Sequence, residues 1–324
     1  MPRLTLDEIE TTVTRALTRH GADDWQAGEV ARAVRLAEAR GNKICGLYYV
    51  ESYCQQLATG RVNGTVEPVV EKARAAAIRV DAGFGFAQPA FMKALPVAIE
   101  AARENGVATL AVCHAHTCTS LGYFTEAIAR SGMVALGFTN ATPIVAAPGG
   151  SKRIIGTNPF AFSVPGEKGV AVQFDFSTSA VALGKITMAK AAGESIPLGW
   201  AVDQDGAPTT DPEAALKGAL VSAGGHKGWG MGVMVEVLAA AMTGGTNSID
   251  VAPLKAPEGA PHDLGQFYIL MDPSTSPDFA DRMNRLIEVV AMDPAARLPG
   301  SALSEPSEVD VAEGVWELIQ TLAG

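Results

Sequence analysis

The amino-acid sequence predicts an α/β protein with α+β layering, in which helices and strands are segregated along the chain. Three features of its 324 residues support this class. Helix-type patterns occupy both ends of the chain, short apolar segments suited to strands dominate the middle, and no internal repeat or low-complexity linker interrupts them. A hydrophobic content of 48% provides ample material for a large core, in one intertwined unit or in two lobes.

The first third of the chain is expected to be mainly helical. Thr5 and Glu8 have the spacing of a capping box, which predicts a helix running to about Arg19. Apolar residues then recur at helical spacing in three further segments. The expected helices cover residues 5–19, 24–40, 50–57 and 89–105.

The middle and the end of the chain alternate strands with a few helices. The apolar run at residues 107–112 is typical of a buried strand, and residues 160–164 and 170–176 suit two strands paired across a Pro-Gly turn. Residues 227–242 are apolar almost all round, which predicts a buried helix stopped by Gly244 and Gly245. Further strands are expected at residues 133–139 and 266–271, and further helices at 123–131 and 278–292.

Composition excludes several classes of protein. The net charge of −10 and the pI near 5.0 argue against a nucleic-acid partner, because phosphate binding needs clustered Lys and Arg. No apolar run reaches the ~18 residues that would span a bilayer, and the first residues lack the apolar stretch of a signal peptide. Four cysteines form neither a CxxC pair nor a disulfide framework. A reduced, cytoplasmic protein is therefore expected, with no membrane partner.

Glycines at residues 83 and 85 could suggest a dinucleotide loop of the Rossmann type. The segment lacks the third glycine, and the residues before it do not form a convincing first strand of a βαβ unit. A turn leading into the helix at Pro89 is the better interpretation, so the Rossmann fold is rejected.

Lys227 lies between glycines at the start of the expected helix at 227–242. Glycines let a ligand approach the backbone, and a helix N-terminus offers unpaired N–H groups and a positive dipole. Lys227 and Gly228 are therefore candidates for binding a phosphate or carboxylate, against the alternative of an ordinary solvated lysine. The role of His226 stays open.

Asp175 closes an apolar strand and precedes the polar run Ser177, Thr178 and Ser179. A carboxylate at the end of such a strand must be hydrogen-bonded or paired, which makes Asp175 either structural or functional. The segment Thr157-Asn158 is a turn by composition and is a second polar candidate.

Two histidines, His114 and His116, follow the strand that ends at Cys113. Their i, i+2 spacing could suit metal ligands, but no Asp, Glu or His cluster in the sequence completes a site, so no metal is predicted. The polar loop continues through Thr117, Thr119 and Ser120, and an ordinary strand-to-helix connection remains a credible alternative.

The motifs, in this order and spacing, resemble those of the malate/L-lactate dehydrogenase type 2 family, over nearly the whole chain. This family comprises nicotinamide-dependent reductases of 2-oxo acids and cyclic imines that do not have the Rossmann fold. The motifs are DFSTS at 175–179, GKI at 184–186, IPLGWA at 196–201, PTTDP at 208–212 and GGHKG at 224–228, with GTNP at 156–159 upstream.

The resemblance implies a fold, an assembly and roles for the candidates. Residues 1–75 and 246–324 would form a helical, dimerising domain, residues 76–245 a cofactor domain on a mostly antiparallel sheet, and the active site would lie at the interface of a homodimer. Asp175 would orient the catalytic acid, and Thr157 and Asn158 would contact the substrate or the nicotinamide. The implied NAD(P)H contacts are Thr117, Thr119, Ser120, Asp175, Ser177, Thr178, Ser179, Lys227, Gly228, Pro299, Gly300 and Ser301, and His116 would contact the cofactor or the substrate.

One position departs from the family pattern. The Ser-His-Gly triplet that carries the family's proton-donating histidine aligns with Ile44-Cys45-Gly46, so Cys45 stands where the imidazole would be. A thiol with a pKa of ~8.5 can donate a proton at neutral pH. Alternatively, Cys45 is a packing residue, and the proton comes from His116, His114, Lys43 or water.

The resulting prediction is an NAD(P)H-dependent oxidoreductase that acts on a small carboxylated carbonyl or cyclic imine, with Cys45, Asp175 and His116 as catalytic candidates. The choice between NADH and NADPH is open. A ketimine suits Cys45 better, because it can arrive already protonated. The alternatives are a cofactor-binding protein that has lost activity and serves as a sensor or partner subunit, and an enzyme in which Cys45 is a nucleophile.

Overall fold

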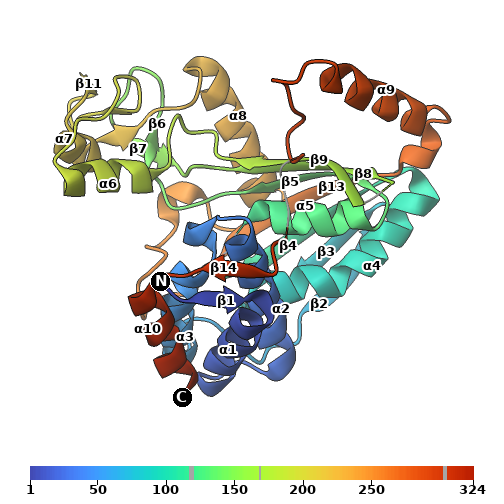
Figure 1. Cartoon of the computed structure of the whole chain (residues 1–324), viewed down its shortest axis with the longest axis horizontal. Coiled ribbons are helices and arrows are strands. Elements are labelled where there is room, and N and C mark those ends of the chain that lie inside the picture. Colours follow the sequence, from blue (N-terminus) through green and yellow to red (C-terminus); the bar gives the residue numbers. More distant parts are fainter. Residues whose placement is uncertain (117–119, 168, 302–304) are drawn as a thin grey trace.

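The computed structural model describes residues 1–116, 120–167, 169–301 and 305–324. Figure 1 shows helices from both chain ends gathered on one side of a large sheet, and a smaller mixed region beside that sheet. The two termini lie close together in the helical part. Among the described residues, no helix is both long and apolar enough to cross a bilayer.

The helical part joins the first and the last residues of the chain. Thr5 caps the first helix in a full capping box with Glu8, as predicted. Two short strands, β1 (Arg3–Thr5) and β14 (Glu308–Asp310), pair antiparallel and tie the two ends together. The packed helices share a buried core around Ile9, Tyr53 and Ile319. They are α1 (Leu6–Arg19), α2 (Asp24–Ala39), α3 (Val50–Thr59) and α10 (Glu313–Ala323).

The large sheet has seven strands in the order β2-β3-β4-β13-β5-β8-β9. Only the β3–β4 pair is parallel, so the prediction of a mostly antiparallel, non-Rossmann sheet is confirmed. The predicted hairpin is the pair β8 and β9. The strands are β2 (Val69–Arg74), β3 (Ala77–Asp81), β4 (Val107–Ala115), β5 (Val134–Thr139), β8 (Phe160–Gly166), β9 (Gly169–Phe176) and β13 (Leu264–Met271).

Strand β13 pairs with β4 on one side and β5 on the other, although it belongs to the segment assigned to the terminal domain. The division of the chain into two domains at residues 75 and 245 therefore stays a proposal. In it, β13 belongs by sequence to the terminal domain but lies in the large sheet of the other domain. Helices α4 (Ala87–Asn105) and α5 (Leu121–Arg130) pack on one face of the sheet around Phe91, Phe124 and Tyr268.

The smaller region contains a five-stranded sheet whose strands are only two or three residues long. Strands this short carry no readable alternation, which explains why the sequence did not predict them. Two helices flank them, α6 (Leu183–Ala192) and α7 (Pro212–Lys217). The strands are β6 (Val145–Ala146), β7 (Arg153–Ile155), β10 (Ala201–Val202), β11 (Pro208–Thr209) and β12 (Ala219–Leu220).

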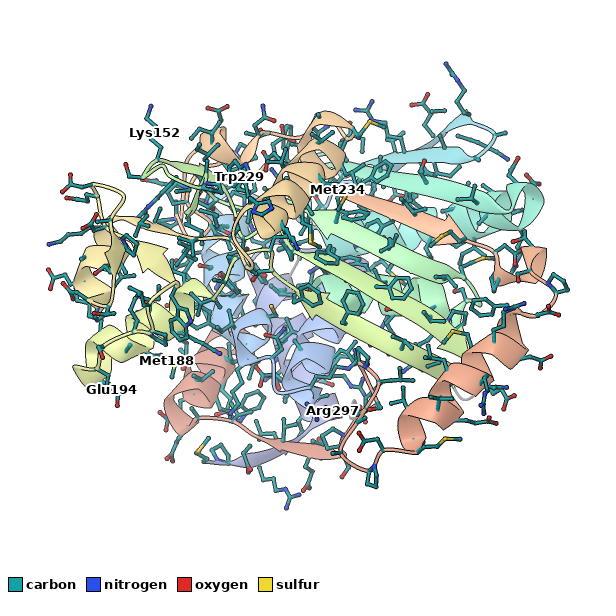
Figure 2. All side chains as sticks on the ribbon, turned by 90° about the horizontal axis from the view of Figure 1, so that it is seen from above. Lys152, Met188, Glu194, Trp229, Met234 and Arg297 are labelled. Atoms are coloured by element: carbon teal, nitrogen blue, oxygen red, sulfur yellow. The ribbon has the colours of Figure 1, made fainter. Side chains whose placement is uncertain are left out.

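Helix α8 (His226–Glu236) continues into a π-helical turn, η3 (Val237–Ala241), at the predicted position, but the prediction that it is buried is wrong for this chain. Its small residues face the protein: a Cβ on Gly232 would come within 2.6 Å of the Ile155 side chain. Several of its large apolar side chains face outward, and Met234, labelled in Figure 2, is 42% exposed, whereas Val235 is buried. The other exposed members are Met231, Val233, Val237 and Met242.

Helix α9 (Phe279–Ala291) is amphipathic, as predicted, yet none of its residues is buried. It projects from the far edge of the sheet in Figure 1. The loop after it returns to the helical part and carries Arg297, which is labelled in Figure 2.

Candidate active site

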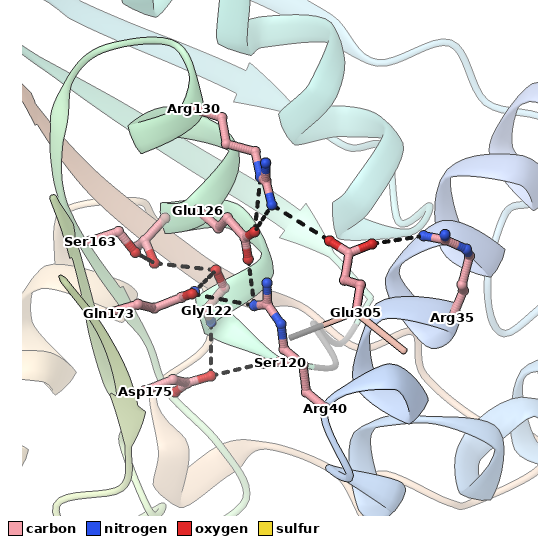
Figure 3. Close-up of polar contacts among 11 residues, drawn as sticks. Arg35, Arg40, Ser120, Gly122, Glu126, Arg130, Ser163, Gln173, Asp175 and Glu305 are labelled. Carbon is pink, nitrogen blue, oxygen red and sulfur yellow. Dashed lines mark hydrogen bonds and ion pairs between the residues drawn. The ribbon is translucent and has the colours of Figure 1, made fainter. Parts of the chain in front are cut away.

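Asp175, at the end of β9, meets the N-terminus of α5. Its Oδ2 accepts hydrogen bonds from Ser120 Oγ at 3.0 Å and from the Gly122 N–H at 2.8 Å (Figure 3). Residue 122 has little room for a side chain, because a Cβ there would lie 3.2 Å from the Asp175 Cβ. The first turn of α5 therefore positions the carboxylate, and its N–H groups and dipole favour the ionised form.

Protein packed around Asp175 acts in the opposite direction, although the side chain keeps contact with solvent at the surface. The loss of solvent raises the pKa of Asp175 above its usual value, although hydrogen bonds from Gly122, Ser120 and Leu121 lower it. A carboxyl group with a raised pKa at the edge of a cavity is typical of a functional site rather than of a purely structural contact.

The cavity beside Asp175 has a volume of about 470 Å³. Its walls come from α2, the start of α5, the end of β9 and the loop after α9. Four of the predicted site residues are among its lining, namely Asp175, Ser120, Pro299 and Gly300. The other residues that line it are Ala33, Leu36, Ala37, Arg40, Asn42, Gly122, Tyr123, Gln173, Phe174, Arg297 and Leu298.

The loop containing Pro299, Gly300 and Ser301 is anchored to β9. The Gln173 N–H donates to the Pro299 carbonyl at 3.0 Å. Gly300 has a φ of +86°, and a Cβ there would come within 2.7 Å of the Gln173 nitrogen, so this close approach requires glycine. The loop therefore lies directly beside Asp175, where a lid over a bound ligand is expected.

Cys45 ends the 3-10 turn η1 (Lys43–Cys45) that follows α2. The next residue, Gly46, has no room for a side chain, because a Cβ would overlap the Glu38 carboxylate, which accepts the Leu47 N–H at 2.8 Å. This contact fixes the chain direction at Cys45.

Cys45 lies within electrostatic range of Asp175. Burial raises the pKa of Cys45 to about 12, and the negative charge of the nearby Asp175 adds to this rise, while a hydrogen bond with Asn42 opposes it. Cys45 is therefore a protonated thiol at neutral pH. Sequence alignment alone suggested this pairing, and the electrostatic coupling between the two groups supports it.

His116 lies in a different environment. It is 1% exposed, stacks on His262 with ring centroids 4.8 Å apart, and meets Tyr53 and Phe86 edge to face. Burial holds the pKa of His116 well below its ordinary value, so the ring is neutral. A neutral, enclosed imidazole is a poor proton donor, which disfavours the catalytic role predicted for His116.

The polar run after Asp175 connects to the start of α8. The Thr178 N–H and Oγ1 both donate to the Thr157 carbonyl, at 2.9 and 3.0 Å, and the Ala223 N–H donates to the Thr178 carbonyl at 2.9 Å. Ser177 and Ser179 share a hydrogen bond of 3.0 Å between their hydroxyl groups. Thr157 and the run 177–179 thus form one unit with the loop that leads into α8.

Lys227 is exposed in the first turn of α8, after Gly225. Gly228 packs against that same preceding loop, because a Cβ would lie 1.9 Å from the Ala223 carbonyl oxygen. The arrangement predicted for an anion site is therefore present: a helix N-terminus, close backbone packing and an exposed ammonium group.

Asn158 is completely buried and has a φ of +37°. Its Nδ2 donates to the Gly232 carbonyl at 3.0 Å and to Glu236 Oε2 at 2.8 Å, and its Oδ1 accepts from Ser248 at 3.4 Å. These contacts favour a positioning role for Asn158, and its direct contact with substrate stays a prediction. The predicted residues Thr117 and Thr119 lie outside the described residues.

A buried polar network behind Asp175 was not predicted from the sequence. Arg40 forms an ion pair with Glu126 and donates to Gln173 Oε1 at 3.3 Å, while Gln173 Nε2 donates to the Gly122 carbonyl at 2.8 Å (Figure 3). Burial by itself would raise the pKa of Glu126, but Arg40 and Arg130 lower it overall. The only signal in the sequence was a glutamine within an apolar strand.

Comparisons with known proteins agree with this geometry. The chain is 36% identical to the Delta(1)-pyrroline-2-carboxylate/Delta(1)-piperideine-2-carboxylate reductase of Pseudomonas putida, over 99% of this chain and 95% of that protein. It is 38% identical to the (2R)-3-sulfolactate dehydrogenase (NADP(+)) of Chromohalobacter salexigens, over 92% of this chain and 90% of that protein.

The crystal structure of delta1-piperideine-2-carboxylate reductase from Pseudomonas syringae superposes with a TM-score of 0.90. That match has 34% identity and covers 99% of this chain and 100% of the other. A family profile described as malate/L-lactate dehydrogenase matches residues 4–318. The chain therefore belongs to the malate/L-lactate dehydrogenase family of NAD(P)-dependent oxidoreductases.

Proposed function

We propose that this protein reduces C2 of a small cyclic 2-imino acid, of the Δ1-pyrroline- or Δ1-piperideine-2-carboxylate type, with Cys45 in the position of the proton donor. A 2-oxo acid is the related, less favoured substrate. The observation that carries the proposal is that the charge of Asp175, which lines a cavity bordered by Pro299 and Gly300, acts on the thiol of Cys45.

The residues present fit a nicotinamide dinucleotide. The start of α8 with Lys227 provides N–H groups and a positive charge for phosphate, the hydroxyl groups of Ser177 and Ser179 lie on the same unit, and Pro299 and Gly300 border the cavity. When bound, the nicotinamide supplies the hydride. The described residues do not select between NADH and NADPH.

The state of Cys45 favours an imine over a ketone. With its pKa raised to about 12, the thiol keeps its proton and is a weak acid. Protonating the oxygen of a ketone would leave a thiolate next to the carboxylate of Asp175, at an electrostatic cost. A cyclic imine can bind already protonated, so it demands little from the enzyme's acid, and the iminium charge is complementary to Asp175.

A substrate panel tests this proposal. Oxidation of NADH and of NADPH would be followed at 340 nm with Δ1-pyrroline-2-carboxylate, Δ1-piperideine-2-carboxylate, 3-sulfopyruvate, oxaloacetate and pyruvate. We expect the two cyclic imines to give the highest kcat/KM. Turnover of the oxo acids alone would overturn the proposal.

The second candidate function is an NAD(P)-binding protein without catalysis. It is favoured by the loss of the family's histidine, because no described residue restores an exposed imidazole beside Asp175. Fluorescence titration that shows cofactor binding, together with no turnover across the panel, would select this alternative.

We also propose a homodimer with α8 in the interface, in addition to the segments 1–75 and 246–324 to which the resemblance assigns dimerisation. Large apolar side chains cluster on the outer face of α8 and η3, and such clusters mark interaction sites more often than free surface. The family resemblance implies an active site at this kind of interface.

A further inference from the structure

Three neighbouring strands of the large sheet deliver polar side chains to one edge. Asp81, the last residue of β3, is paired in register with Cys113 of β4. Asp263 immediately precedes β13, whose first residue, Leu264, pairs with Ala115 near the end of β4. Because β13 runs antiparallel to β4, the start of β13 and the ends of β3 and β4 meet at the same edge.

The backbone dihedral angles of His114 differ from those of a regular strand. Consecutive side chains of an extended strand point to opposite faces, so Cys113 and His114 would normally diverge. His114 instead has a φ of +49°, and its Nδ1 lies 2.9 Å from Asp81 Oδ1. Its ring contacts Phe84, which also has a positive φ, of 62°. Unusual backbone conformations at two touching residues are costly and tend to persist at functional sites.

This backbone conformation assembles a compact set of ligand atoms. One carboxylate oxygen of Asp81, the Cys113 sulfur and a ring nitrogen of His114 all lie within 4.8 Å of one another. The thiol is fully buried, while Asp81 and His114 are partly open to solvent. Small side-chain movements would therefore bring the three atoms around one ion.

Asp263, whose carboxylate lies outside this group of three in the structure, is the candidate for a fourth ligand. Its Oδ2 accepts from Thr246 at 3.1 Å, whereas its Oδ1 is buried and has no hydrogen-bond partner among the described residues. Its charge is close enough to raise the pKa of Cys113. A buried carboxylate oxygen without a partner is costly, and a bound cation would relieve that cost.

Arg79 completes the surroundings of the sulfur. Its Nε donates to Cys113 Sγ at 3.4 Å, as an outer partner that stabilises a thiolate. The charges balance when a divalent ion is present: Asp81, Asp263 and the thiolate contribute three negative charges, and the ion and Arg79 contribute three positive ones.

We propose that Asp81, Cys113, His114 and Asp263 bind one divalent transition-metal ion of the Zn²⁺ type as a structural clip. Sulfur, nitrogen and oxygen ligands in a set of four suit tetrahedral Zn²⁺, and a site closed by four protein ligands is structural rather than catalytic. The ion would join β3, β4 and β13. The sequence analysis considered His114 as a metal ligand but predicted no metal, because Asp81 and Asp263 are distant in sequence from Cys113 and His114.

Cobalt titration of the full-length, chelator-treated protein tests the site through its sulfur ligand. We expect saturable binding of about one Co²⁺ per chain with a thiolate-to-cobalt absorption band in the near ultraviolet. The Cys113→Ser variant should lose this band. The matched control Cys54→Ser, which changes another buried cysteine in α3, should retain it. Persistence of the band in Cys113→Ser, or the lack of saturable binding by the wild type, would overturn the proposal.

Zinc affinity tests the remaining ligands by competition with a chromophoric chelator. His114→Asn and Asp263→Asn should each weaken Zn²⁺ binding at least about tenfold, since even the loss of an outer partner has an effect of that size. Zn²⁺ should raise the Tm of the wild type and not that of His114→Asn. Because His114 is partly exposed, this variant is expected to fold even if Cys113→Ser does not. Equal affinity and an equal rise in Tm in His114→Asn would contradict the site.

Discussion

At the scale of single residues, the proposed chemistry depends on Cys45 and Asp175. The resemblance places the thiol where the family has its imidazole, but the thiol holds its proton far more tightly, with a pKa of about 12. The negative charge of Asp175 contributes to the raised pKa of Cys45, because it disfavours a second negative charge nearby. Two predictions follow from this pair.

Replacing Cys45 should separate catalysis from cofactor binding. Cys45→Ser should lower kcat toward 2-oxo acids by about 10- to 100-fold, within the usual contribution of a general acid, lower it less for an imine that binds already protonated, and leave the Kd for NAD(P)H almost unchanged. Cys45→His should maintain or raise activity toward 2-oxo acids.

Since the wild-type thiol titrates only near pH 12, the pH–rate profile of the wild type should show no decline from Cys45 below about pH 10. In Cys45→His, activity should fall as the imidazole loses its proton near neutral pH. Full activity of Cys45→Ser would make Cys45 a packing residue.

Asp175→Asn should stabilise the fold while impairing the reaction. The pKa of Asp175 is raised in the folded state, so its ionised form destabilises the folded protein once the pH exceeds the pKa of the unfolded chain. At low pH both states are protonated and this effect disappears. The Tm of Asp175→Asn should therefore exceed that of the wild type at pH 8 and converge with it near pH 4. A lower Tm at pH 8 would show that the charge is stabilising.

At the scale of elements, the sequence predicted the helices that have local signals and missed features that depend on long-range packing. The capping box at Thr5 and Glu8 located α1, and extended apolar periodicity located α2 and α4. Strands of two residues carry no such pattern and were missed. The position of α8 was predicted correctly. Its burial within its own chain was predicted wrongly, because an apolar pattern does not distinguish an internal contact from a contact with a second molecule.

The candidate site was likewise predictable only where its residues belong to local sequence motifs. Asp175 and the loop at Pro299 were found from motifs, and both line the cavity. The network of Arg40, Glu126 and Gln173 could not be found, because its members are separated by up to 133 residues.

The next prediction concerns the contribution of Lys227, at the start of α8, to cofactor binding. Lys227→Ala should weaken NAD(P)H binding by roughly 1–3 kcal/mol, the contribution of a charged hydrogen bond. Fluorescence titration measures the change. The control is Lys152→Ala, which removes an exposed lysine near β7, labelled in Figure 2, and should bind cofactor normally. Unchanged affinity in folded Lys227→Ala would remove Lys227 from the cofactor site.

Gln173 tests the link between β9 and α5. Gln173→Leu removes one side-chain donor from the Gly122 carbonyl and one of the acceptors of Arg40, so unfolding should become easier by about 1–3 kcal/mol. Because Gly122 also donates to Asp175, kcat should fall more than KM rises. Denaturant unfolding and steady-state kinetics measure the two effects. Gln320→Leu, on the exposed side of α10, should change neither. Equal kcat in the two variants would limit Gln173 to a structural role.

At the scale of the whole molecule, the cavity lies where the two parts of the chain meet. Helix α2 belongs to the end-to-end helical part, whereas β9 and α5 belong to the large sheet, and the loop after α9 crosses between them. A ligand in this cavity would contact both parts at once. We therefore expect cofactor binding to raise the Tm of the whole chain, through preferential binding to the folded state.

The exposed apolar side chains on the outer face of α8 and η3 lead to the last prediction, that the active protein is a homodimer. Met231, Met234 and Val237 are between 38% and 50% exposed, on a helix whose opposite face carries the glycines and alanines that pack inward. A charge placed there would be buried without a partner in a dimer, so Met234→Glu should shift the protein towards monomer. Light scattering at micromolar concentration measures the mass. Met188→Glu, on an apolar residue of α6 that is 72% exposed, is the matched control and should stay dimeric. Since the active site is expected at the interface, Met234→Glu should also lose activity in proportion to the loss of dimer. A wild-type protein that is monomeric and fully active would contradict both the interface and its link to catalysis.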